Sequence, residues 1–129
     1  MIAIIAAIIV VVLFIGLSIF QILLAAGKPL GQFAFGGKYP EVLPKNLRIM
    51  SLVAVGIFVL GSISVLVRVG ILAIIPDSIV FVIIVWVLAI YLSLNTLMNI
   101  ASKSESEKKF MTPVSLSLAI CLFIVAIVA

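Results

Sequence analysis

Residues 1–26 read MIAIIAAIIVVVLFIGLSIFQILLAA, an apolar run whose only polar side chains are Ser18 and Gln21. A helix rises about 1.5 Å per residue, so this run reaches ~39 Å, which is enough to cross a bilayer with some tilt. It lacks the positive n-region and the shorter apolar core of a cleaved signal peptide. The run therefore predicts a first transmembrane helix at about residues 2–26, which we expect to remain uncleaved.

Downstream, apolar runs alternate with connections rich in polar residues, glycine or proline. Residues 27–46 contain three prolines and four glycines, a composition that excludes a continuous helix. Asp77 or Ser78 is a suitable N-cap for a third helix, and Thr112 followed by Pro113 is typical of a helix start. We therefore predict further helices at about 47–68, 77–102 and 113–129, with loops at 27–46 and 103–112.

The composition requires that these helices lie in lipid. Hydrophobic residues make up 67% of the chain and charged residues 9%, whereas about a quarter of a soluble domain is charged. So few charges cannot form a water-facing surface. The prediction is an all-α, polytopic membrane protein with residues 1–129 in a single domain, folded as an up-and-down bundle of four transmembrane helices.

The basic residues orient this bundle. One of the eight, Arg68, lies at the end of the second helix, on the other side, and the other seven belong to the first and third loops. Because loops rich in Lys and Arg remain in the cytoplasm, we predict that both of these loops are cytoplasmic and that both termini are outside. The same placement beside apolar segments argues against nucleic acid as a partner.

The residues that are missing restrict the chemistry. The chain has no histidine and a single cysteine, Cys121, so the usual zinc sites, an intrachain disulfide and a Ser-His-Asp triad are absent. None of the four acidic residues lies deep in a predicted helix. Because proton pathways ordinarily use ionisable residues within the membrane, this placement also argues against a proton-coupled transporter. Glu105 and Glu107 are predicted to be solvated in a charged loop. We expect no enzymatic activity, no cofactor and no metal.

Uncharged polar residues gather in the half of the bundle near the predicted cytoplasmic side. Tyr91, Asn95 and Asn99 are spaced i, i+4, i+8 and share one stripe of the third helix, while Gln21 lies at a similar depth in the first. Two interpretations remain open. The groups hydrogen-bond across helices and only hold the bundle together, or they line a cavity open to the cytoplasm.

The first loop also allows two interpretations. Gly36-Gly37-Lys38 lacks the strand and the Gly-Lys-Ser/Thr ending of a phosphate-binding loop. Its aromatic and basic residues suit the headgroup region of the membrane, which is the favoured interpretation. The alternative is a lid that binds a partner or ligand and covers the cavity, with Lys38 and Arg48 at the mouth.

Three stretches carry a resemblance: Gly27-Lys28-Pro29-Leu30-Gly31 with the later Gly36-Gly37-Lys38 and Leu43–Arg48, then Ser93–Asn99, then Met111-Thr112-Pro113. Together they resemble an uncharacterised group of small four-helix bacterial integral membrane proteins. The resemblance implies a bacterial cytoplasmic membrane and the same topology, but no activity, substrate or catalytic residue.

The resulting functional prediction is a non-enzymatic membrane protein. It binds a membrane lipid, a small amphipathic ligand or a partner membrane protein through the cavity facing the cytoplasm. The alternative is a small transporter subunit that acts as a homo- or heterodimer, with Ser62, Ser64 and Arg68 on the outer side. The predicted ligand-binding residues are Gln21, Lys38, Arg48, Tyr91, Asn95 and Asn99.

Overall fold

The computed structural model describes all residues from 1 to 129 and contains four long helices and no strand. Each helix is long and apolar enough to cross a membrane, which confirms the prediction of an all-α chain with four such helices. The helices are α1 (Ile2–Ala25), α2 (Lys45–Arg68), α3 (Ile79–Ile100) and α4 (Glu105–Val128), and two short 3₁₀ turns, η1 (Gly31–Phe33) and η2 (Phe35–Gly37), lie between α1 and α2.

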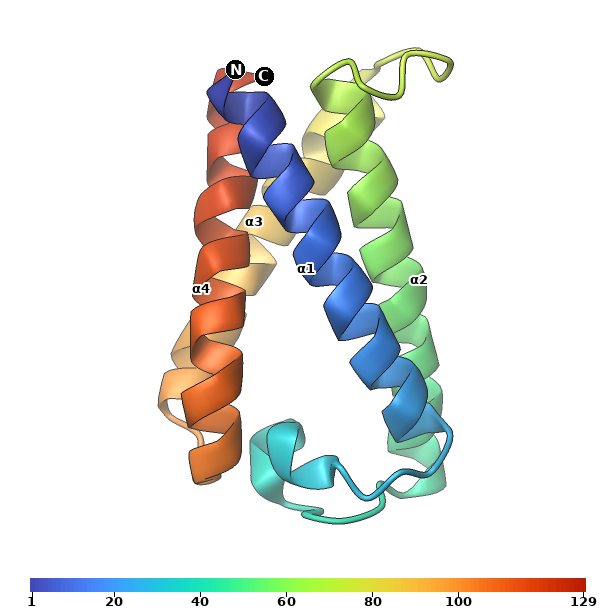
Figure 1. Ribbon diagram of the computed structural model, residues 1–129, viewed down its shortest axis with the longest axis vertical. Helices are drawn as coiled ribbons and strands as arrows, with labels where there is room; N and C mark the ends of the chain where they lie inside the picture. Colours follow the sequence, from blue (N-terminus) through green and yellow to red (C-terminus); the bar gives the residue numbers. More distant parts are fainter.

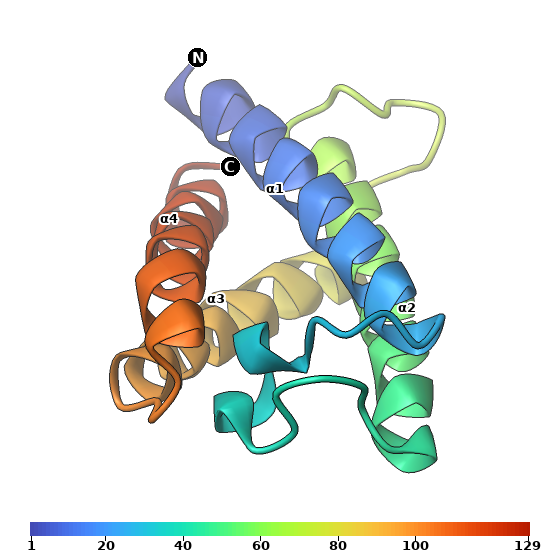
Figure 2. The ribbon, with the colours of Figure 1, turned by 60° about the horizontal axis from the view of Figure 1, so that its bottom comes forward.

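Consecutive helices run in opposite directions, so both chain ends and the α2–α3 connection lie at one end of the bundle, the terminal end (Figure 1). The opposite end, the loop end, carries the segment between α1 and α2 and the short α3–α4 connection. α1 packs against both α2 and α4, and α3 packs mainly against α4. Toward the loop end the α1–α2 pair separates from the α3–α4 pair, and the η1–η2 segment lies between them (Figure 2).

The hydrophobic core occupies the half of the bundle nearest the terminal end. Phe14 of α1 stacks on Phe58 of α2, with ring centroids 5.0 Å apart. Small side chains on α1, such as Ala6 and Ala7, are buried in the same cluster as Leu122 of α4. Helices in a bilayer associate through van der Waals contact rather than through the hydrophobic effect, so these small residues stabilise the bundle by permitting close approach.

The outer surface of the bundle is apolar on every helix. Only about 28–33% of the most apolar window of each helix is buried within the protein, and isoleucine, valine and leucine side chains cover the remainder. Monomeric soluble proteins rarely expose apolar patches larger than a few hundred Å². The surface thus has the character required of helices that face acyl chains.

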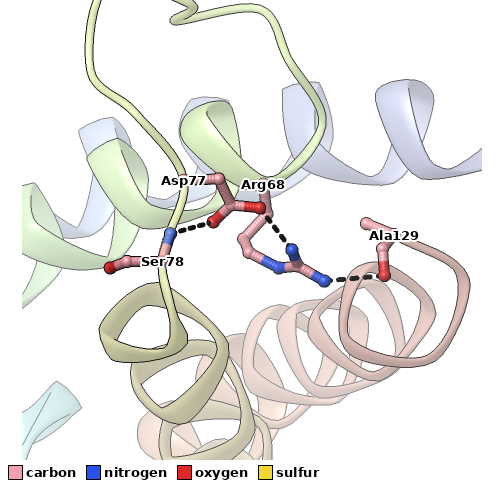
Figure 3. Close-up of polar contacts among 4 residues, drawn as sticks. All are labelled: Arg68, Asp77, Ser78 and Ala129. Carbon is pink, nitrogen blue, oxygen red and sulfur yellow. Dashed lines mark hydrogen bonds and ion pairs between the residues drawn. The ribbon is translucent and has the colours of Figure 1, made fainter.

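Polar contacts join three elements at the terminal end (Figure 3). The Arg68 guanidinium forms an ion pair with the Asp77 carboxylate and donates a second hydrogen bond to the backbone oxygen of Ala129, 2.7 Å away. The other Asp77 oxygen accepts from the backbone N–H of Ser78 at 2.8 Å. Ser78 is the N-cap of α3, but its side chain makes no capping hydrogen bond. The single arginine of this end is therefore neutralised where α2, α3 and α4 meet.

The predicted start of the fourth helix at Pro113 is wrong. α4 begins eight residues earlier, at Glu105, with Ser104 as its N-cap, and the Ser104 hydroxyl accepts from the backbone N–H of Glu107 at 3.3 Å. Acidic side chains in the first turn favour this start because they complement the positive end of the helix dipole. Pro113 lies inside the helix, and Thr112, the predicted N-cap, has a buried hydroxyl without a hydrogen-bond partner.

The close contact at Gly61, where α2 meets α1 and α3, provides a test of the helix packing in the core. A Cβ atom at Gly61 would lie 2.6 Å from Cδ1 of Leu88 and 3.0 Å from Cε2 of Phe14, whereas one at Gly56 would meet nothing within 4 Å. We expect Gly61→Val to lower the free energy of unfolding by about 1–3 kcal/mol through overpacking. The matched control, Gly56→Val on the same helix, is expected to have little effect. Thermal unfolding of both variants in detergent micelles would contradict the packing if their melting temperatures fell equally.

Candidate functional site

A cavity of about 710 Å³ lies at the loop end, between the two separating helix pairs and the η1–η2 segment. This volume is within the range of sites that bind small molecules. Most of its wall is apolar, and all four helices contribute to it. Its polar lining consists of the side chains of Gln21, Tyr91, Asn95, Asn99, Ser102, Lys103, Glu107 and Ser115.

Within the predicted stripe of α3, Asn99 is committed to helix packing. Its amide Nδ2 donates to the Ser115 hydroxyl at 3.0 Å and to the Met111 carbonyl at 3.3 Å, both on α4. The same nitrogen donates to Oδ1 of Asn95 at 3.0 Å. Thr96 adds a further bond to Ser115. Asn99 therefore joins α3 to α4 and orients Asn95.

Two other amides in the wall are free to bind a ligand. Gln21 of α1 makes no hydrogen bond with the protein, and the amide nitrogen of Asn95 donates none. Both side chains are partly buried. The Tyr91 hydroxyl also has no partner in the protein, and this side chain lies where the cavity meets the space between α2 and α3. Polar groups held against apolar walls without partners favour a ligand that supplies complementary hydrogen bonds.

The first loop covers the cavity from the loop end. Phe33 packs edge-on against Phe20 of α1 at 6.3 Å and against Phe110 of α4 at 5.7 Å between ring centroids, so it bridges the two helix pairs. Phe35 and the two glycines that follow have positive φ angles of 52°, 68° and 73°. Glycine adopts this conformation readily, and it is uncommon for a residue such as phenylalanine. The tight left-handed turn places Phe35 in the cavity wall.

Two hydrogen bonds fasten this loop to the start of α4. The Ser104 hydroxyl donates to the Gln32 carbonyl, and the Glu107 carboxylate accepts from the backbone N–H of Gly36 at 3.4 Å. A Cβ atom on Gly37 would lie 2.5 Å from Cβ of Ser104, so only glycine fits there without a shift. The loop is thus a fixed cover, built by residues distant in sequence.

Glu107 is the polar group that the sequence interpretation missed. It was predicted to be solvated in a charged loop, but it is only 7% exposed and lines the cavity. The prediction failed because it placed residues 103–112 outside a helix. Ser104 and Glu107 have the S-x-x-E spacing of a helix start, and that spacing was the available signal.

Two predicted site residues lie outside the cavity wall. Arg48 donates from Nε to the carbonyl of Ala25 at 3.0 Å, so it caps the C-terminal end of α1. Lys38 extends over the ring of Tyr39, with Nζ 5.6 Å from the centroid. Lys103 is the basic side chain that lines the cavity. The structure therefore brings together Gln21, Tyr91, Asn95 and Asn99, and leaves Lys38 and Arg48 apart.

An apolar groove of about 360 Å³ lies between α2 and α3, on the side where these helices make little contact. All seven of its lining residues are hydrophobic, and no sequence pattern predicted this groove. Ile57 and Tyr91 line both this groove and the cavity. The two spaces therefore adjoin near the middle of the bundle, with the polar one toward the loop end and the apolar one extending toward the terminal end.

The polar residues predicted for the outer side of a transporter subunit already form hydrogen bonds or an ion pair within the protein. Ser62 and Ser64 donate to carbonyls one turn earlier in α2, at 2.8 and 2.7 Å, and Arg68 is paired with Asp77.

Comparisons with protein-family models, curated proteins and solved structures found no match to this chain.

The different roles of the two asparagines can be tested by alanine substitution. Asn99→Ala removes the hydrogen bonds to Ser115 and Met111, each contributing about 0.6 kcal/mol on average and at most about 1.7. We expect it to lower the thermal stability clearly more than Asn95→Ala, which removes a single bond within α3. Melting temperatures measured in the same detergent compare the two variants. A larger decrease for Asn95→Ala than for Asn99→Ala would contradict the packing role assigned to Asn99.

Proposed function

We propose that this chain is a multi-pass membrane protein that binds a membrane lipid, without catalysis. The headgroup occupies the cavity and one acyl chain lies in the groove between α2 and α3. The observation that carries this proposal is the junction of the two spaces at Ile57 and Tyr91. A polar chamber that adjoins a wholly apolar groove is complementary to an amphipathic molecule.

The energetics assign different tasks to the two spaces. A lipid tail gains little by moving from the bilayer into the groove, because acyl chains are as apolar as leucine side chains. The groove therefore accommodates the tail and orients it. Preference for one lipid has to arise from the cavity, where the free amides of Gln21 and Asn95 offer hydrogen bonds that tails cannot use.

The distribution of charge supports a cytoplasmic loop end. Seven of the eight basic residues lie in or beside the two connections of that end. The remaining one, Arg68, is paired with Asp77 at the terminal end. By the positive-inside rule, we place the loop end in the cytoplasm and both termini outside. Together with the resemblance to small bacterial membrane proteins, this favours the bacterial cytoplasmic membrane, with the headgroup bound on its cytoplasmic side.

A bulky side chain in the groove tests the proposal. Ile83 and Ile90 both lie on α3 with similar exposure, 54% and 53%, but only Ile83 lines the groove. We expect Ile83→Trp to abolish most of the lipid retained by the protein, because the indole fills the space for the tail. Ile90→Trp should leave retention unchanged. Native mass spectrometry of protein released from lipid nanodiscs measures both.

Equal retention by the two variants would contradict a lipid in the groove. The alternative roles have their own signatures in the same experiments. A second copy of the chain or a partner membrane protein would appear as a defined complex that either tryptophan leaves intact. Movement of a solute across protein-containing liposomes would favour the transporter subunit.

A further inference from the structure

We infer that the lipid bound at this site carries a primary ammonium next to its phosphate, as in phosphatidylethanolamine, with Glu107 binding the ammonium and Lys103 the phosphate. This inference rests on the proposed function and specifies the headgroup. It begins from the charges in the cavity wall, where these two side chains are the ionisable groups of opposite sign.

Glu107 is a buried carboxylate without a cationic partner. The only ion pair of the protein joins Arg68 to Asp77 at the opposite end of the bundle. The single hydrogen bond that the Glu107 carboxylate accepts comes from Gly36 and is long, at 3.4 Å. A carboxylate offers about four lone-pair positions, and buried charges are ordinarily paired. The unfilled acceptor positions therefore favour a cationic group in the cavity.

Other residues of the cavity wall add to the attraction for a cation. Phe33 and Phe35 contribute aromatic rings to the same wall. The face of an aromatic ring attracts an ammonium group electrostatically. Gln21 adds an amide oxygen that can accept a hydrogen bond. A primary ammonium has three N–H donors for these acceptors, whereas the trimethylammonium of phosphatidylcholine has none, so the site distinguishes two headgroups of equal net charge.

Lys103 provides the complementary positive charge. It lines the cavity, it is exposed, and it forms no ion pair within the protein. Ammonium groups bind phosphate oxygens through charge-assisted hydrogen bonds. Opposite charges in one chamber match a zwitterion whose phosphate and ammonium are connected by a short link. An anionic headgroup would meet the unpaired carboxylate of Glu107, which disfavours phosphatidylglycerol.

The test uses nanodiscs made from equimolar phosphatidylethanolamine, phosphatidylcholine and phosphatidylglycerol with identical dioleoyl chains. Native mass spectrometry then reports which lipid the intact protein retains. We expect phosphatidylethanolamine to exceed each of the others by about tenfold, the ratio that one charge-assisted hydrogen bond supplies. Glu107→Gln, which can still accept from Gly36, should reduce this ratio to nearly one. The control Glu105→Gln changes an exposed carboxylate in the same turn, outside the cavity wall, and should preserve it.

The outcomes separate this inference from the proposed function. Equal retention of all three lipids by the wild-type protein, or enrichment of phosphatidylglycerol, overturns the headgroup inference, while loss of retention in Ile83→Trp still supports lipid binding. A wild-type protein that retains no lipid overturns both. Enrichment that persists in Glu107→Gln overturns the role of Glu107. If Glu107→Gln fails to fold, the wild-type comparison of the three headgroups decides.

Discussion

The attachment of the first loop to the start of α4 is the constraint on which the cavity depends. Elsewhere the two helix pairs are joined by close packing, as where Gly61 of α2 meets Leu88 of α3, but toward the loop end they separate (Figure 1). Phe33, inserted between Phe20 and Phe110, and the hydrogen bond from Ser104 to Gln32 connect the pairs again across that opening. The result is a partly covered cavity instead of a widening gap between helices.

This arrangement also explains how a carboxylate comes to be buried in so apolar a chain. Glu107 lies in the first turn of α4, where the helix dipole favours negative charge. It is covered because the Gly36 backbone, in a left-handed turn, approaches it. The left-handed turn, the helix start and the buried charge are thus parts of one contact. A change in any of them alters the chamber.

Sequence patterns predicted four helices long enough to cross a membrane because each contains a long apolar run, but they missed the charged first turns of α4. The spacing of Tyr91, Asn95 and Asn99 predicted that they share one face of a helix, since helical periodicity is a local property, and all three line the cavity. Spacing could not separate the roles of Asn95 and Asn99, because the distinction arises from Ser115 on another helix. Arg48 was misplaced for a similar reason, as its partner is a carbonyl at the end of α1. The burial of Glu107 depended on a contact spanning 71 residues, which no local pattern reports.

The apolar groove between α2 and α3 has a consequence for exchange. In the proposed binding mode a lipid enters sideways, with its tail between the helices, and does not pass through water. Desorption of a phospholipid into the aqueous phase, with its large hydrophobic penalty per methylene, is then not part of the cycle. Occupancy follows the mole fraction of the preferred lipid in the surrounding membrane by mass action. A small bundle of this kind would register the composition of the membrane in which it resides.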